Sequence, residues 1–407
     1  MRKHLVYLLL LTVALALASC RGTPAPTTAP VATTAATSAP TSAPTVAPTT
    51  AAAQTTPAGA ATSSATTASA QTTPAAQATA PAGSPTPVVA RGRLATVLNR
   101  KRLVCGINGS LAGFSTLEAS GDYSGLDVEF CKALAAALFN DVKAVDYRKL
   151  NTTERFAAIQ NGEVDVVFRN TTYTLNRDSA VGVDFGPTTF YDGGGMMVPK
   201  KNNIKKLEDL NGATICVLTG TTNEQVLADV FKARNIKYTP LTFNDAAPLY
   251  QAYEQGRCDA VTSDKSQLAG QRASLLKTPD DHVIMDDTLS KEPLTAMVAQ
   301  NDSQWKDVVT WVVYATWYAE EAGVSSKNVD QMKSSDDPNI KRFLGATGTL
   351  GKDMALTNDV FYQVIKLVGN YGEIYERTLG PNTKFNVPRG LNQPYTKGGI
   401  QYAPPFR

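Results

Sequence analysis

Short apolar runs behind glycine turns set the first expectation for the fold. Asn161-Gly162 leads into residues 164–168, Val-Asp-Val-Val-Phe, and such a run is typical of a buried parallel strand. The polar segment that follows, residues 169–178, contains hydroxyls, amides and the guanidinium groups of Arg169 and Arg177. Ligands collect beyond the carboxyl ends of parallel strands, and arginine binds carboxylates through two parallel hydrogen bonds. The segment therefore predicts a site for a small anion-bearing ligand, with a solvated polar loop as the alternative.

A second segment repeats this layout. Residues 254–264 follow the order of residues 160–170: a helix end, a glycine, two residues, an aspartate, a strand and a polar tip. The corresponding positions are Gly162 and Gly256, Asp165 and Asp259, and Asn170 and Asp264. The strand openings at 105–110 and 216–221 also resemble each other, with Cys105 aligned to Cys216. A loose duplication predicts two α/β lobes that face one cleft. Arg177 from one lobe and Asp264 from the other would be complementary to a zwitterion.

Spacing and capping signals predict the remaining α/β elements. Residues 102–108 and 214–218 are expected as strands, and apolar positions between 128 and 138 have helical spacing. Asn151 and Glu154 resemble a capping pair that opens a helix through Gln160. Thr221 and Glu224 have the same spacing, so a helix should begin there and its free N–H groups could receive a carboxylate.

The chain is expected to be helical beyond residue 300. One face of the first helix carries Trp305, Val308, Val309, Val312, Val313 and Thr316, and Gly323 should end it. Nearby aromatic residues are expected in the core rather than around a cofactor. Residues 357–368 and 371–379 are predicted as packing helices, and the chain beyond Gly380 is expected to lie extended over the surface.

The N-terminus has the features of a lipoprotein signal peptide over residues 1–20. A basic start precedes an apolar stretch, Leu5 to Ala18, that is too short for an ordinary membrane span. The small residues before Cys20 resemble the bacterial lipobox, in which that cysteine is acylated, with palmitate among the acyl groups, and becomes the mature N-terminus. A simple secretory signal with an incidental cysteine is the alternative.

Residues 21–90 read as a disordered tether. From Gly22 to Ala90 the chain is almost entirely Thr, Ala, Pro, Ser and Gln, without a charged residue, which gives too little apolar bulk to offset the entropy of ordering. Residues 1–90 contain three basic residues and no acid, so they account for the formal net charge of +3. The remaining part, residues 91–407, is charge-balanced and gives no basic patch for nucleic acid.

Four cysteines remain once Cys20 carries lipid, and an even number in an exported domain favours disulfides. Three pairings are possible. We favour Cys105–Cys131 and Cys216–Cys258, because each bond then stays inside one lobe and leaves the lobes free to move. Four buried free thiols are the alternative.

Enzymatic and metal signals are weak. His282 is the only histidine after the signal peptide, so there is no histidine pair for zinc and little support for a histidine-based triad. Residues 345–353 have the wrong spacing for a phosphate loop, with Asp353 where Ser or Thr should bind magnesium. The sequence predicts neither a cofactor nor a metal.

From about Leu98 to the C-terminus, the chain resembles the polar amino-acid-binding proteins of bacterial ABC transporters (family 3 solute-binding proteins), and especially their general L-amino-acid-binding branch. The similar segments are 124–130, 162–177, 220–224 and 263–264. The resemblance implies a type II periplasmic-binding-protein fold: two α/β lobes joined by a two-strand hinge, here with a helical C-terminal extension.

The same resemblance implies roles for residues in the cleft. Arg177 would bind the ligand α-carboxylate together with the backbone of Thr222, at the start of the helix that follows Thr221. The α-amino group would be held by Asn170, Thr172 and Asp264. Asp127 would be structural and tie the following helix to its loop. This sequence lacks the aromatic residues that many relatives place on the ligand, with Leu111 and Thr152 in their positions, and it lacks an acidic residue near Asn108. Arg169 could favour acidic or amide side chains, or it could form an ion pair between the lobes.

These features predict a monomeric, lipid-anchored extracytoplasmic receptor, on the periplasmic side or the cell surface, that delivers L-amino acids to ABC permease subunits. The alternative is an exported enzyme of the same fold, similar to cyclohexadienyl dehydratases. A sensory ligand domain is disfavoured because no signalling module follows. The segments 191–195, which contains three successive glycines, and 290–294 are the expected crossings between lobes. They divide the chain into lobe one, 91–192 and 294–407, and lobe two, 193–293.

Overall fold

The computed structural model of the protein describes residues 88–407, and the predicted signal peptide, Cys20 and nearly all of the predicted tether lie outside this range. Two lobes share one nine-stranded sheet, with the strand order β5-β1-β6-β12-β7-β10-β8-β9 and with β11 paired to β7. The strands are β1 Leu103–Ile107, β5 Val145–Lys149, β6 Val166–Thr172, β7 Val183–Pro199, β8 Ala213–Leu218, β9 Tyr238–Phe243, β10 Ala260–Asp264, β11 His282–Ile284 and β12 Ser290–Ala299. A separate small sheet consists of β2 Ser110–Leu111, β3 Ser115–Leu117 and β4 Tyr123–Ser124.

The two lobes repeat one arrangement of parallel strands. In the first lobe β1 pairs in parallel with β5 and β6, and in the second β8 pairs in parallel with β9 and β10. The helices that accompany these strands are α1 Gly92–Arg100, α2 Leu126–Phe139, α3 Glu154–Gln160, α4 Leu175–Ala180, α5 Thr222–Ala233, α6 Ala246–Glu254 and α7 Lys265–Leu275. The predicted α/β duplication is thus present.

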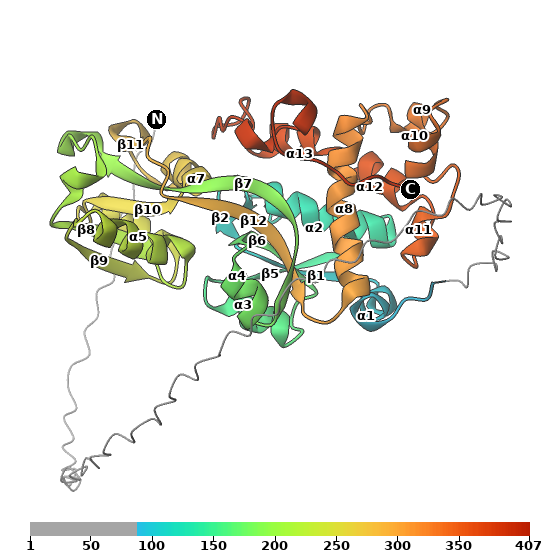
Figure 1. Cartoon of the computed structure of the whole chain (residues 1–407), viewed down its shortest axis with the longest axis horizontal. Helices are drawn as coiled ribbons and strands as arrows, with labels where there is room; N and C mark the ends of the chain where they lie inside the picture. The colour runs from blue at the N-terminus through green and yellow to red at the C-terminus, as the bar shows by residue number, and fades with distance from the viewer. Residues whose placement is uncertain (1–87) are drawn as a thin grey trace, which may run out of the picture. The chain divides into compact units, whose positions relative to one another are not determined.

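The long strands β7 and β12 connect the lobes and run antiparallel side by side (Figure 1). The later part of β7, from Gly194 to Met197, also pairs with β10 of the second lobe, and β12 from Leu294 onward also pairs with β6 of the first. Between these regions the paired segments 191–193 and 291–293 have no further strand beside them. The sheet therefore narrows to two strands at this crossing.

The C-terminal region is helical, as predicted, and packs against the first lobe (Figure 1). Its helices are α8 Ser303–Glu321, α9 Val329–Met332, α10 Pro338–Phe343, α11 Leu350–Asp353, α12 Val360–Leu367 and α13 Tyr371–Thr378. The expectation that the chain beyond Gly380 lies extended on the surface is wrong for its end. Phe406 is 4% exposed and packs among the rings of Trp311, Tyr318, Phe343 and Phe361. Burial of this aromatic ring anchors the C-terminus.

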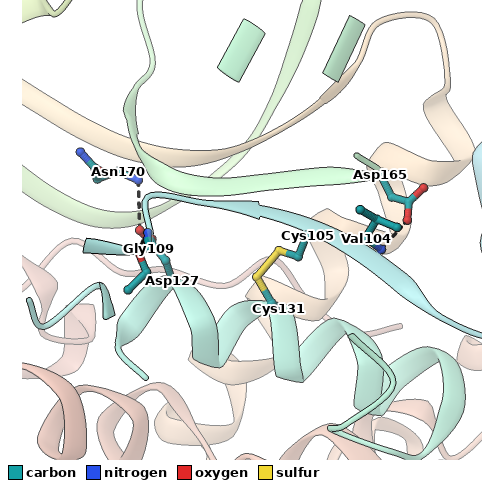
Figure 2. Close-up of a disulfide and its surroundings, with 8 residues drawn as sticks. Val104, Cys105, Gly109, Asp127, Cys131, Asp165 and Asn170 are labelled. Atoms are coloured by element: carbon teal, nitrogen blue, oxygen red, sulfur yellow. Dashed lines mark hydrogen bonds between the residues drawn. A yellow bond between two sulfur atoms is a disulfide. The ribbon is translucent and has the colours of Figure 1, made fainter. Parts of the chain in front are cut away.

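Both expected disulfides are present in the structure. Cys105 on β1 is bonded to Cys131 on α2 (Figure 2), and Cys216 on β8 is bonded to Cys258 just before β10. Each bond stays within one lobe. Among residues 88–407, no helix is both long and apolar enough to cross a membrane.

The proposed alignment of Cys105 with Cys216 is wrong by one residue. Cys105 lies opposite Val166, whereas the equivalent position in the second lobe, opposite Ala260, is Ile215. Successive side chains of a strand point to opposite faces, so a shift of one residue moves a side chain to the other face. Cys216 accordingly packs with residues of α6, whereas Ile215 packs with residues of α5.

Candidate ligand-binding site

A narrow cavity of about 20 Å³ lies where the strand ends of the two lobes meet, and all seven ligand-binding residues predicted from the sequence line it. They are Asn170, Arg169, Thr172 and Arg177 from the first lobe and Thr221, Thr222 and Asp264 from the second. The structure thus brings together residues that are up to 95 positions apart in the chain. Asn108, Thr152 and Arg155 also line the cavity, whereas Leu111 is buried outside its lining.

Arg177 contacts both lobes. The Thr174 side chain caps helix α4 by accepting a hydrogen bond from the Arg177 backbone N–H. One terminal nitrogen of Arg177 donates to the Thr172 carbonyl at 2.9 Å, and the other donates to the Gly220 carbonyl of the second lobe at 3.4 Å. Burial lowers the pKa of Arg177, while the charges of Glu292 and Asp264 act in the opposite direction. Its guanidinium is therefore a desolvated cation at the cavity wall, where an anionic ligand group would compensate it.

Asp264 supplies the opposite charge at the end of β10. Its carboxylate accepts hydrogen bonds from Asn223 Nδ2 at 2.7 Å and from Gln267 Nε2, and the residue is only 2% exposed. Burial raises the pKa of Asp264 well above its usual range, and the charges of Asp192 and Glu292 raise it further, against the two amide hydrogen bonds. A cationic group in the cavity would stabilise the ionised form of this carboxyl.

Arg169 and Arg155 add two more buried cations. Arg169 Nε donates to the Leu150 carbonyl at 2.8 Å, and Nη1 has no hydrogen-bond partner. Burial lowers its pKa to about 10. Within residues 88–407 Arg169 forms no ion pair, which weighs against the alternative of an ion pair between the lobes.

Arg155 was not identified from the sequence. It is 2% exposed in α3 and donates to Thr171 Oγ1 at 3.2 Å, while its Nε has no partner. Burial lowers the pKa of Arg155 well below its usual range, and the nearby cations Arg169 and Arg177 lower it further. A signal did exist, because Arg155 shares the buried helix face with Ala158 and Ile159, three and four positions later. An arginine on the apolar face of a short helix needs a buried anion or acceptor.

Asn170 is held at the cavity by its backbone. It adopts a left-handed conformation with a φ of 38°, and its N–H donates to Asp127 Oδ2 at 3.1 Å (Figure 2). Asp127 therefore ties the start of α2 to β6, whereas the resemblance implied a tie between this helix and its loop. The side-chain Oδ1 of Asn170 has no hydrogen-bond partner, so it is a free acceptor at the cavity.

Thr172 and Thr222 face each other across the lobes, with 3.4 Å between their hydroxyl oxygens. Thr222 is the first residue of α5, whose N-cap Thr221 accepts from the Glu224 N–H as the spacing predicted. The first turn of α5 thus opens onto the cavity, and such a turn presents backbone N–H donors to an anion. The predicted Asn151–Glu154 capping pair at α3 is also present.

Comparison with known proteins agrees with this fold. Residues 103–315 match the bacterial extracellular solute-binding proteins, family 3. The general L-amino acid-binding periplasmic protein AapJ of Rhizobium johnstonii is 52% identical over 305 residues, covering 74% of this chain and 89% of AapJ. The glutamate/glutamine/aspartate/asparagine-binding protein BztA of Rhodobacter capsulatus is 44% identical over 315 residues, covering 77% of this chain and 93% of BztA.

A solved structure extends the similarity to three dimensions. It is an ABC transporter / periplasmic binding protein from Brucella ovis with glutathione bound. It has a TM-score of 0.76 and 45% sequence identity, and the similarity covers 78% of this chain and 100% of that one. The similar proteins are binding proteins, which establishes a binding protein rather than an enzyme of the same fold. The chain therefore belongs to the bacterial extracellular solute-binding proteins of family 3.

Proposed function

We propose that this protein captures L-amino acids outside the cytoplasm and delivers them to the permease of an ABC transporter. The observation that carries the proposal is the pair of opposite charges in one cavity, the Arg177 guanidinium and the Asp264 carboxylate. An α-carboxylate and an α-ammonium group on one small molecule would satisfy both. The amino-acid-binding relatives AapJ and BztA support the same class of ligand.

The preferred side chains are acidic or amide. Arg155 and Arg169 each present a buried nitrogen without a partner, and a carboxylate or amide oxygen would accept from them. The four amino acids in the name of BztA are of this kind, whereas the name of AapJ favours a broader range. Acidic and amide side chains would then rank first within a broad selectivity.

Calorimetric titration with a ligand panel tests the proposal. L-Glutamate, L-glutamine, L-aspartate and L-asparagine should bind more tightly than L-leucine and L-lysine, and each should be recovered unchanged. Glutathione belongs in the panel because it was bound in the Brucella protein and its γ-glutamyl end carries the same zwitterion. Binding of glutathione alone would replace free amino acids with γ-glutamyl peptides as the ligand. Absence of binding by the whole panel would refute the proposal.

A matched pair of arginine variants tests the side-chain assignment. Arg155→Gln should weaken L-glutamate binding by about 2–5 kcal/mol, because one partner of a desolvated charged pair is lost. L-Alanine, which has no acceptor for Arg155, should be affected much less. Arg102→Gln is the control, since Arg102 pairs with Asp146 at an exposed position outside the cavity lining. Equal losses of affinity for L-glutamate and L-alanine in Arg155→Gln would show that Arg155 does not contact the ligand side chain.

We also propose that Cys20 carries the lipid and that residues 21–90 tether the receptor to the membrane. The support is the lipobox-like sequence before Cys20 and the uncharged composition after Gly22. As a flexible coil, about 70 residues would span roughly 50 Å. Cys20→Ser should abolish incorporation of labelled palmitate and move the protein out of the membrane fraction, where the unmodified protein should remain.

The lobes are proposed to close around the ligand. The expected boundaries, 192/193 and 293/294, fall where the sheet narrows to β7 and β12, which supports a hinge there. The cavity volume of about 20 Å³ is of the order of a single water site, so an amino acid would enter only after the lobes separate.

A further inference from the structure

A carboxylate behind the cavity contacts both lobes. Glu292 lies on β12 in the two-stranded crossing and is 1% exposed. Its Oε2 accepts from the Thr172 hydroxyl at 2.5 Å and from the Thr222 hydroxyl at 2.7 Å, while Oε1 accepts from the Ser290 hydroxyl. Glu292 is not part of the cavity lining, but both threonines are. It therefore touches the ligand space only through these two hydroxyl groups.

These hydrogen bonds fix what the two threonines can offer a ligand. A hydroxyl has one hydrogen to donate, and a carboxylate can only accept. The hydrogens of Thr172 and Thr222 both point to Glu292, so their oxygens present only lone pairs to the cavity. Two acceptors suit an ammonium group, which has only donors, and they repel a carboxylate.

The charge of Glu292 acts in the same sense. Glu292 contributes to the pKa shifts of both Arg177 and Asp264, which places its charge near both ends of the proposed zwitterion site. A negative charge behind the two threonines attracts an ammonium group and repels a carboxylate.

We infer that Glu292 is a positioning residue that makes the site selective for the α-ammonium group, by holding Thr172 and Thr222 as acceptors and by adding a negative charge behind them. The inference rests on the proposed function, since it assigns the group that discriminates amino acids from their deaminated analogues. The same contacts require both lobes to be close, because the threonines come from β6 and α5. Glu292 can therefore hold both threonines as acceptors for the ammonium group only when the two lobes are closed.

Calorimetry with L-glutamate and glutarate tests this role. Glutarate has both carboxylates of glutamate but no amino group. In Glu292→Gln, the ratio of the two affinities should fall by at least about tenfold, as expected for a weakened hydrogen bond to a charged group. An unchanged ratio in a folded Glu292→Gln protein would overturn the inference. Failure of the unmodified protein to bind any amino acid would instead overturn the proposed function.

The control is Glu129→Gln, which removes a similarly buried glutamate that pairs with Arg377 and Lys132 away from the cavity. Its affinity ratio should match that of the unmodified protein.

A double-mutant cycle shows whether Glu292 acts through the hydroxyl. In a Thr172→Val background, Glu292→Gln should lower the ratio by less than it does alone. Fully additive losses would mean that Glu292 does not act through Thr172.

If Glu292→Gln does not fold, a second pair of variants tests the acceptor role of the Thr172 hydroxyl. Thr172→Ser retains the hydroxyl that Glu292 orients, so it should preserve the preference for glutamate over glutarate. Thr172→Val removes that hydroxyl at nearly constant size and should lower the preference. Equal ratios in the two variants would contradict an acceptor role for this hydroxyl.

Discussion

The Asp127 carboxylate holds the backbone N–H of Asn170 at 3.1 Å, and so it connects the first turn of α2 to the cavity (Figure 2). Asp127 is 2% exposed. Burial raises its pKa to about 7, even though the Asn170 N–H and the charge of Arg169 both favour the ionised form. A carboxyl that is costly to ionise therefore fixes the backbone of a residue assigned to the ligand.

This geometry predicts that the free energy of unfolding depends on pH. Asp127→Asn should make that dependence weaker. Because the pKa in the folded state is raised, the stabilisation is fully present below the pKa of an unfolded carboxyl, about 4, and is lost as the pH rises through about 7. The change amounts to at most about 4 kcal/mol. Asparagine cannot titrate, and its side-chain oxygen can still accept from Asn170. Denaturant unfolding across this range should give a flatter curve for Asp127→Asn.

Asp146→Asn is the control for this measurement. Asp146 is an exposed carboxyl whose pKa is lowered by its hydrogen bond to Arg102. Its stabilisation is present above the unfolded pKa and is lost as the pH falls, so the variant should leave the slope between about pH 4 and about pH 7 unchanged. Parallel curves for Asp127→Asn and the unmodified protein would show that the burial of Asp127 has no effect on folding.

The repeated unit explains why so much of the fold could be predicted. Asp165 Oδ2 accepts from the Val104 N–H at 2.7 Å, and Asp259 Oδ2 accepts from the Thr214 N–H at 2.8 Å (Figure 2 shows the first). Each aspartate ties the start of its strand to the neighbouring strand. Gly162 and Gly256 both have positive φ, 71° and 74°, which glycine adopts without strain. These local requirements restrict the positions to aspartate and glycine, and both residue types can be recognised in the sequence.

What could not be predicted depends on tertiary packing. Helical spacing puts Arg155 on the apolar face of α3, but only the packing of α3 places it beside Arg169 and Arg177. The bonds of Glu292 join segments 70 and 120 residues apart in sequence, so no local pattern announces them. The alignment of Cys105 with Cys216 failed because identical residue types outweighed the strand register.

Arg177→Lys should weaken amino-acid binding nearly as much as Arg177→Ala. Lysine keeps the charge, but it loses the planar group that here donates to Thr172 and Gly220 and could still present further N–H groups to a carboxylate. A loss of about 2–5 kcal/mol is expected, measured by calorimetry with L-glutamate. An affinity within a few-fold of the unmodified protein would show that charge alone is sufficient.

Amino-acid affinity should increase with pH because of Asp264. Its pKa is raised in the ligand-free cavity, by burial first and then by Asp192 and Glu292, and a bound ammonium group would lower it. Binding below the raised pKa must therefore release a proton, and it becomes stronger as the pH approaches that value. Calorimetry in buffers of different ionisation enthalpy should detect the proton.

Asp264→Asn should bind amino acids weakly and without this proton release. Its affinity for glutarate, which has no ammonium group, should fall less. If proton release persisted in the variant, another group would be responsible for it.

Removing either disulfide should lower stability without changing ligand selectivity. The bonded cysteines are 26 and 42 residues apart, and loop closure of this size corresponds to about 3–4 kcal/mol in the chain-entropy model. None of the four cysteines lines the cavity. Denaturant unfolding of the Cys105→Ala/Cys131→Ala and Cys216→Ala/Cys258→Ala proteins measures the loss, and calorimetry checks the selectivity. A changed ranking of ligands would mean that a disulfide shapes the site.

The last prediction concerns the hinge. The Asn392 side chain accepts from the Tyr191 N–H at 2.7 Å and donates to the Tyr191 carbonyl at 3.0 Å, so the C-terminal region holds β7 just before Gly193. Gly194→Pro would not test hinge motion cleanly, because a Cβ at Gly194 would lie 2.5 Å from Ser290 Oγ. Asn392→Ala removes both bonds from outside the cavity lining. It should cost about 1–3 kcal/mol of stability and loosen the crossing.

Small-angle scattering should then show that saturating L-glutamate reduces the radius of gyration of the unmodified protein. Ligand-free Asn392→Ala should be larger than the ligand-free unmodified protein. Its affinity should fall equally for glutamate and glutamine, because closure is part of binding while no ligand contact is lost. Thr96→Ala, which removes an exposed hydrogen bond within helix α1, is the control. An unchanged radius on saturation, together with full affinity in Asn392→Ala, would indicate a rigid pocket instead of a hinged one.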